Sequence, residues 1–330
     1  MISIRKAAAL ALLAALVSPA WAQTPSTGSG QAYPSRPVRV IVTFPPGGTP
    51  DIYGRVMSAE LQKIWNQSVV VENRTGAGGT IGTDYVAKAA PDGYTLLFAA
   101  DASITIAPHL YSKLPYDPVR DLAPIVNVTA GPFVLMANPA FPPNNVKELI
   151  ALVRTQPGKI SYASSGAGGQ QHLAMESIRS IAGNMDMIHV PYKGFGQGIA
   201  DVLANQVPLI FGGITASIQF TRSGKLKALG VTGPKRSRAM PTVPAIAETL
   251  PGFDITAWYG FLAPAGTPRE IVKKVHDDSV TIIHRADFQE RLERDGIDPV
   301  GNTPEEFAAQ IKTDLARWAV IVKAAGAKLD

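Results

Sequence analysis

The sequence contains no cysteine. This absence excludes disulfide bonds, cysteine metal ligands and a thiol nucleophile. A chain of 330 residues, of which 46% are hydrophobic, does not need such covalent links, because it can bury a core large enough to fold without them.

Spacings typical of zinc sites and of serine hydrolases are also absent. The five histidines stand at positions 109, 172, 189, 276 and 284, and none of their spacings is typical of zinc ligands. Ser164 and Ser165 each lack the glycine two residues earlier that a nucleophile elbow requires. We therefore expect no metal and no local catalytic motif, and a catalytic triad dispersed along the sequence is left open.

The sequence also lacks a strong excess of either charge: it has 31 Lys and Arg and 26 Asp and Glu, which gives a formal net charge of +5. The basic residues are scattered, apart from the run Lys235–Arg238 in a loop flanked by prolines. A run of four favours a solvated turn over a nucleic-acid patch. No nucleic-acid partner is expected.

The N-terminus has the organisation of a secretory signal. Arg5 and Lys6 precede an apolar run at residues 7–18, and Ala20–Ala22 gives a small-x-small cleavage pattern. The run is too short to span a bilayer, which needs about 20 residues. We predict a signal peptide at residues 1–22 with cleavage after Ala22, a flexible leader at 23–34, and a periplasmic location.

Beyond the leader, β-branched segments alternate with segments of helical apolar periodicity. Strands are predicted at 38–43, 69–73, 94–99, 133–137, 160–163, 187–190, 207–211 and 228–231. Helices are predicted at 49–64, 80–90, 146–155, 268–283, 286–295 and 304–325, and another through residues 172–178. This alternation predicts an α/β fold with mainly parallel sheets flanked by helices, and the length predicts two lobes.

A glycine-rich turn between a strand and a helix occurs three times, at Pro46–Thr49, Gly76–Gly79 and Ser164–Gly168. The first amides of a helix lack intrahelical partners, the helix dipole adds positive charge there, and glycine allows an anion to approach closely. In an α/β sheet such turns meet at the carboxyl edge, where ligands bind. They predict an anion site, and the alternative is that the glycines only permit tight turns.

A dinucleotide or nucleotide cofactor fits these turns poorly. Ile81 and Gln171 occupy the positions where the third glycine of a dinucleotide fingerprint would stand, and no P-loop lysine follows either turn. We therefore expect no cofactor. His172, four residues after Gly168, could either hydrogen-bond a ligand oxygen or fill a polar pocket.

From about Tyr33 onward, the sequence resembles a known family of receptors. The resemblance is carried by Phe44–Asp51, Val70–Gly79, Pro91–Leu96, Val190–Gly194, Trp258–Pro268 and Gly301–Phe307. These stretches are similar, in the same order, to the substrate-binding proteins of tripartite tricarboxylate transporters, also called Bug or TctC-type receptors. The resemblance covers nearly the whole chain after the leader.

The resemblance implies a Venus-flytrap fold of two α/β lobes. Lobe 1 would comprise residues 35–126 and 256–330 and grip a carboxylate, and lobe 2 would comprise 127–255 and set specificity. The protein would be a monomer that captures a small organic carboxylate for integral-membrane transporter subunits, without catalysis. A sensor subunit for a membrane kinase and, less favoured, an exported hydrolase are the alternatives.

The resemblance also implies a set of ligand-binding residues around the cleft. They are Phe44, Pro46, Gly47, Gly48, Thr49, Asp51, Gly76, Ala77, Gly78, Gly79, Ala100, Asp101, Ser103, Ser164, Ser165, Gly166, Gly168, His172, Tyr192 and Lys193. Asp101 departs from a carboxylate-binding pattern, so it would either accept a hydrogen bond from the ligand or, as we favour, point into solvent. Lys193 would be a distal cation. Dicarboxylates, tricarboxylates, amino acids and aromatic acids all remain possible ligands.

Overall fold

The computed structural model describes residues 33–183 and 185–329. A compact unit begins at Arg36 and accounts for the rest of the described chain, and Tyr33–Ser35 are assigned to a separate unit. The predicted signal peptide, and all of the predicted leader before Tyr33, lie outside the described residues. Among the described residues, no helix combines the length and hydrophobicity that crossing a bilayer would need.

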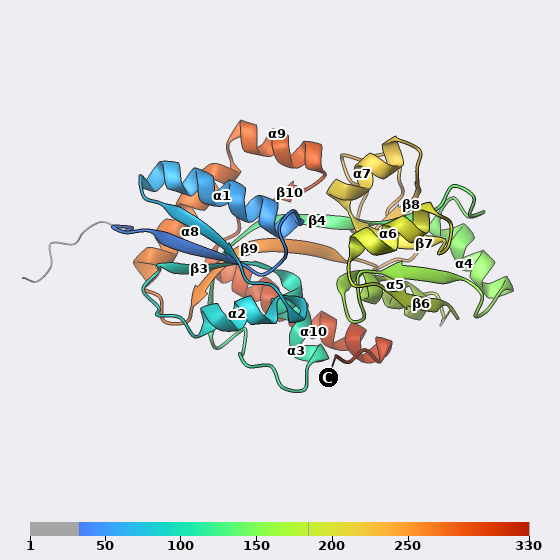
Figure 1. The fold of residues 1–330 in the computed structure, drawn as a ribbon, viewed down its shortest axis with the longest axis horizontal. Coiled ribbons are helices and arrows are strands. Elements are labelled where there is room, and N and C mark those ends of the chain that lie inside the picture. Colours follow the sequence, from blue (N-terminus) through green and yellow to red (C-terminus); the bar gives the residue numbers. More distant parts are fainter. Residues whose placement is uncertain (1–32, 184, 330) are drawn as a thin grey trace, which may run out of the picture. The chain divides into compact units, whose positions relative to one another are not determined.

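Strands and helices alternate along most of the compact unit (Figure 1). The strands are β1 (Val38–Val42), β2 (Val69–Asn73), β3 (Thr95–Ala100), β4 (Leu122–Ala137), β5 (Ser161–Ser164), β6 (Ile188–Pro191), β7 (Leu209–Gly213), β8 (Lys227–Val231), β9 (Thr256–Pro264) and β10 (Asp298–Pro299). The α-helices are α1 (Thr49–Trp65), α2 (Thr80–Ala87), α3 (Ala107–Leu110), α4 (Val146–Thr155), α5 (Gln170–Ile181), α6 (Phe195–Leu203), α7 (Ile214–Arg222), α8 (Arg269–Ile283), α9 (Ala286–Asp295) and α10 (Pro304–Ala325). Short turns of other helix types are η1 (Ala77–Gly79), η2 (Ala102–Ile106) and η3 (Ile246–Glu248).

The strands follow the order β2-β1-β3-β9-β4-β7-β5-β6, and β8 and β10 also pair with β4. The long strand β4 divides this order, because Leu122–Pro132 pairs with β9 whereas Phe133–Ala137 pairs with β7 and β8. We call β1, β2, β3, β9, β10 and the first part of β4 the first section. The second section comprises β5, β6, β7, β8 and the remainder of β4.

The expected α/β class is confirmed, and the sheet is mixed. Strands joined by helical crossovers pair in parallel, as β1 does with β2 and β3, and β5 with β6 and β7. All pairs that involve β4 or β9 are antiparallel. These two strands run side by side between the sections (Figure 1), and they are antiparallel because the chain leaves the first section along one and returns along the other.

Helices cover both faces of the first section. On one face, Val86 of α2 and Phe307 of α10 pack into a buried cluster with Leu97 of β3 and Trp258 of β9. On the other face α1 lies so close that a Cβ on Gly54 would come within 2.9 Å of the Val42 side chain. This close packing holds the start of α1 directly against the end of β1.

Candidate ligand-binding site

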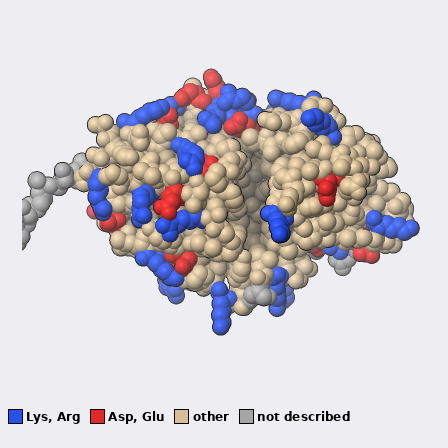
Figure 2. Space-filling model, viewed as in Figure 1, with Lys and Arg blue, Asp and Glu red and all other residues tan. Residues whose placement is uncertain are grey.

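A cavity of about 720 Å³ lies between residues of the two sections. Its lining comprises Phe44, Gly47, Gly48, Thr49, Pro50, Ile52, Gly78, Ala100, Ala102, Ile106, Ala107, Leu110, Tyr111, Phe133, Ser165, Gly166, Ala167, Gly168, Gly169, Gln170, Gln171, Phe195, Gly213, Thr215, Ala216, Gln219, Phe220, Tyr259 and Leu329. Figure 2 shows the surface hollowed at this place, between the start of α1 and helices α6 and α7.

The turn from β1 to α1 forms one wall of the cavity. Gly47, Gly48 and Thr49 line it, and a side chain on Gly47 would meet no atom within 4 Å. Pro50 fits the first turn of α1, where its missing N–H is not needed. The backbone amides of Thr49 and Asp51 have no hydrogen-bond acceptor among the described residues. Two donors at the positive end of a helix therefore remain for an anion.

Asp51 shapes this turn from inside the protein and does not line the cavity. Its carboxylate accepts hydrogen bonds from the amide of Gly47 at 3.0 Å, from Arg55 at 2.9 Å and from Asn73 at 2.7 Å. Burial opposes ionisation of Asp51, but the hydrogen bonds from Arg55, Asn73 and Gly47 outweigh it and lower the pKa. The residue acts as an ionised support for the turn.

The turn before α2 contributes Gly78 alone to the cavity lining. Gly78 has a φ of +64°, and the space that its Cβ would occupy is open. Gly76 and Gly79 have a different function. A Cβ on Gly76 would come within 2.6 Å of the Ile81 side chain, and a Cβ on Gly79 would come within 3.1 Å of the Thr43 and Ser103 side chains. They allow the turn to pack closely.

Asp101, at the end of β3, is 1% exposed, so the prediction that it points into solvent is wrong. Its Oδ2 accepts a hydrogen bond from Nε2 of Gln170 in α5 at 2.6 Å, and Oδ1 has no partner among the described residues. Burial raises the pKa of Asp101 well above its ordinary value, and nearby Asp314 raises it further. Only the neighbouring Ala100 and Ala102 reach the cavity lining.

The turn from β5 to α5 forms the facing wall and is anchored by buried Ser164. The Ser164 hydroxyl lies 2.7 Å from Nε2 of His189, donates to the carbonyl of Gly166 at 3.0 Å and accepts from the Gly166 amide at 3.2 Å. A hydroxyl has one proton, so all three contacts are satisfied when neutral His189 carries its proton on Nε2. His189 then donates to Ser164 and does not act as a base toward it.

His172 stands behind the same turn, and the cavity lining does not include it. Its Nδ1 accepts a hydrogen bond from the amide of Gly168 at 3.1 Å, and its ring stacks on His189 with centroids 4.0 Å apart. Burial lowers the pKa of both histidines, and for His189 the adjacent His172 adds to the effect, giving about 4. The Tyr162 ring also stacks on His189, with centroids 4.9 Å apart.

The structure thus divides the twenty residues that the sequence pointed to. Phe44, Gly47, Gly48, Thr49, Gly78, Ala100, Ser165, Gly166 and Gly168 line one cavity. Pro46, Asp51, Gly76, Ala77, Gly79, Asp101, Ser103, Ser164, His172, Tyr192 and Lys193 are outside its lining. Several of the latter support the turns: the Ser103 hydroxyl, for example, lies 3.0 Å from the hydroxyl of Thr83, which donates a hydrogen bond to the carbonyl of Gly79.

Tyr192 and Lys193 lie on the loop before α6. Tyr192 donates to Asp201 at 2.6 Å, and Lys193 is exposed, so neither is positioned by a contact with the cavity. Sequence reasoning missed Gln170, Tyr259 and the phenylalanines of the second section. Gln170 is the first residue of α5, and a glutamine at a helix start carries no distinctive sequence signal.

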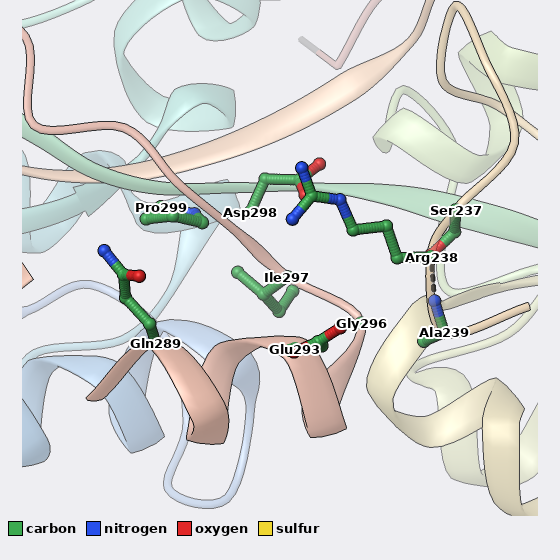
Figure 3. Close-up of a pocket in the computed structure, with 9 residues that line it drawn as sticks. All are labelled: Ser237, Arg238, Ala239, Gln289, Glu293, Gly296, Ile297, Asp298 and Pro299. Carbon is green, nitrogen blue, oxygen red and sulfur yellow. Dashed lines mark hydrogen bonds between the residues drawn. The ribbon is translucent and has the colours of Figure 1, made fainter. Parts of the chain in front are cut away.

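No group of three or more potential metal ligands occurs within residues 33–183 and 185–329. A second hollow, of about 80 Å³, lies between the end of α9, β10 and the segment Ser237–Ala239. Figure 3 shows its lining residues, which include Arg238, Glu293 and Asp298. A hollow of this size holds a few water molecules rather than an organic acid.

The chain belongs to the tripartite tricarboxylate transporter family receptors, whose family model matches residues 53–327. It is 37% identical over 306 residues to protein BugT of Bordetella pertussis, covering 91% of this chain and 93% of BugT. The protein is therefore a solute-binding receptor by family and by fold.

Two solved structures of Rhodopseudomonas palustris proteins share the fold. Rpa4515 with adipate is 31% identical with a TM-score of 0.83, and the match covers 90% of this chain and all of that one. MatC with bound malate is 32% identical with a TM-score of 0.77, and the match covers 88% of this chain and all of MatC.

Proposed function

We propose that the protein captures a small organic carboxylate in the periplasm and passes it, chemically unchanged, to integral-membrane transporter subunits. The observation that carries this proposal is the convergence of unpartnered amides at one cavity. Thr49 at the start of α1 and Gly78 before α2 both line it, and their N–H groups have no acceptor among the described residues. Such amides at helix starts are suited to a carboxylate.

The comparisons support the same ligand class. Receptors with the same fold bind adipate and malate, both of which are carboxylates. The site therefore agrees with the family in the kind of group that it would hold, and its cavity lining offers this group backbone amides and no charged side chain.

We further propose that residues 35–126 and 256–330 form lobe 1, and that 127–255 form lobe 2. The change of partners along β4, from β9 at Pro132 to β7 at Phe133, supports placing the first crossing between the lobes on this strand. Closure of the lobes would be favoured by a ligand that contacts both walls at once.

The exported location is part of the proposal and rests on residues 1–22. Mass spectrometry of the protein from a periplasmic fraction should find Gln23 at the N-terminus. An uncleaved chain that remains with the membrane would contradict it.

Two observations disfavour hydrolysis at Ser164. The residue is buried, its side chain is committed to Gly166, and it does not line the cavity. Within the described chain, no hydrogen bond or ion pair joins His189 to a carboxylate that could orient it as a base.

A thermal-shift panel tests the proposed function. Organic carboxylates are compared with the primary amides of the same skeletons, because a ligand that binds only the native state raises the melting temperature. We expect some carboxylates to raise it and their amides to leave it unchanged. Equal shifts by acids and amides, or none by any acid, would contradict carboxylate capture.

A further inference from the structure

The chain returns to the cavity after its last helix. Helix α10 ends at Gly326, which has a φ of +60°, and the amide of Ala327 donates to the carbonyl of Val322 at 3.3 Å. A left-handed residue in this position ends a helix and satisfies its last carbonyl groups. Residues 327–329 then approach α3, as Figure 1 shows for the segment that follows α10.

Leu329 meets both sides of the cavity at one place. Its amide donates to the carbonyl of Leu110 in α3 at 3.1 Å. A Cβ on Gly168 would come within 3.1 Å of the Leu110 side chain and within 3.2 Å of the Leu329 side chain. Leu110 follows β3 of the first section, and Gly168 follows β5 of the second. Leu329 therefore lies where the two walls approach each other.

All three of these residues line the cavity, but they differ in exposure. Leu110 and Gly168 are buried, whereas Leu329 is 38% exposed. Contact with the carbon atoms of a ligand would remove part of this exposed apolar surface from water, which favours binding. Packing within the protein thus leaves the Leu329 side chain partly uncovered at the cavity.

The rest of the lining divides into amides at helix starts and apolar side chains. Backbone amides reach the cavity in both sections, as at Thr49 in α1, Gln171 in α5 and Thr215 in α7. Apolar and aromatic side chains occupy much of the remainder, namely Phe44, Ile106, Ala107, Tyr111, Phe133, Phe195, Phe220 and Tyr259. Charged ends of a ligand therefore have partners in either section, and its carbon skeleton would lie against the apolar groups, Leu329 included.

From these contacts we infer that Leu329 is a specificity residue. Its side chain closes the cavity at the place where the two walls approach, and it limits the size of the carbon skeleton that fits. The inference deepens the proposed function and rests on it, because it takes capture of a carboxylate in this cavity as given. A smaller side chain at this position should therefore admit a longer acid.

The absence of cysteine from the chain allows a first test at this residue. In Leu329→Cys the only thiol of the protein stands at the cavity. A saturating carboxylate should slow its reaction with iodoacetamide at least about tenfold, because a covered thiol is less accessible. The control is Val320→Cys, since Val320 in α10 is 70% exposed and lies outside the cavity lining. Equal rates with and without the acid in Leu329→Cys would contradict contact between the ligand and this residue.

Calorimetric titration with acids of graded length tests the limit on size. Monocarboxylates run from butanoate to decanoate and dicarboxylates from succinate to sebacate, so acids with one and with two charged ends are both represented. The affinity for decanoate is divided by that for hexanoate, and the affinity for sebacate by that for adipate. We expect Leu329→Ala to raise these ratios about tenfold over the parent protein, because each additional buried methylene strengthens binding about fourfold. Val320→Ala should leave them unchanged.

The outcomes separate this inference from the proposed function. Equal ratios in the parent protein and Leu329→Ala would overturn the inference and leave carboxylate capture standing. Failure of every acid to bind any of the three proteins would count against carboxylate capture itself, and the inference would fall with it.

Discussion

The side-chain amide of Gln170 donates a hydrogen bond to Oδ2 of Asp101 at 2.6 Å. This contact joins the start of α5, in the second section, to the end of β3, in the first. Asp101 lies in a fully buried position, and its other carboxyl oxygen has no partner among the described residues. The hydrogen bond that joins the two sides of the cavity therefore depends on the Asp101 carboxyl group, whose ionised form is destabilised by burial.

Replacing Asp101 with asparagine should stabilise the protein at neutral pH. Burial and Asp314 raise the pKa of Asp101, so the folded state holds a proton that the unfolded chain releases, and stability falls as pH rises above about 4. Asp101→Asn keeps an acceptor for Gln170 and removes this dependence. We expect a melting temperature about 2–4 °C higher at pH 8, with the difference shrinking toward pH 4.

The matched control is Asp277→Asn, because hydrogen bonds from Lys273 and His276 lower the pKa of this exposed carboxylate. The control should give no stabilisation at pH 8. An Asp101→Asn variant that melts below the parent protein at pH 8 would contradict the assignment.

Gly78→Asn should weaken ligand binding and leave the fold intact. The φ of Gly78 is +64°, which asparagine tolerates better than most residues, and the new side chain would project into open cavity space. We expect calorimetry to show affinity at least about tenfold lower, with a small change in melting temperature. Gly224→Asn is the control, since Gly224 has a φ of +68° and open space away from this cavity. Equal binding by the two variants would exclude Gly78 from the site.

Acid should loosen the second-section wall through its paired histidines. Burial lowers the pKa of His172 and, together with His172, lowers that of His189 to about 4. Because the unfolded chain takes up protons on these groups first, stability should fall as pH decreases from about 6.5 toward about 4. The Nδ1 atom of neutral His172 accepts a hydrogen bond from the amide of Gly168. In protonated His172 this nitrogen would carry a proton and could no longer accept that bond.

Thermal melts of the parent protein and His189→Gln between pH 7.5 and 4.5 check this expectation. The glutamine amide can still donate to Ser164 but does not titrate. The variant should therefore lose less stability over this range than the parent protein. If the two proteins lose the same stability over this pH range, the histidine pair is not the cause of the acid sensitivity.

Local sequence signals were sufficient to predict the strand, turn and helix start that form the first wall of the site. The β-branched run at Val38–Val42, followed by Gly48 and Pro50, predicted a strand, a turn and a helix start where the structure has them. The α6 segment was missed, because Gly196 and Gly198 within it disfavour a helix in isolation. It forms where Ile199 and Val202 bury their side chains, which is a tertiary effect.

Side-chain direction could not be read from the sequence in the same way. The turns containing Gly76, Gly78 and Gly79 were located correctly, yet only the fold shows that Gly78 alone lines the cavity. Asp101 was assigned to solvent because nothing in its local sequence indicates Gln170, which is distant in the chain and close in space. The aromatic lining likewise comes from separate elements that long-range strand pairing brings together.

The central claim is that the amides at the starts of α1 and α2 hold the ligand carboxylate. Amide ¹H–¹⁵N correlation spectra, recorded while a binding carboxylate is titrated into the labelled protein, test it most directly. We predict that the largest downfield amide proton shifts occur at Thr49 and Gly78. Shifts confined to residues outside the cavity lining, such as Ser237–Ala239, with these two amides unmoved, would contradict the account.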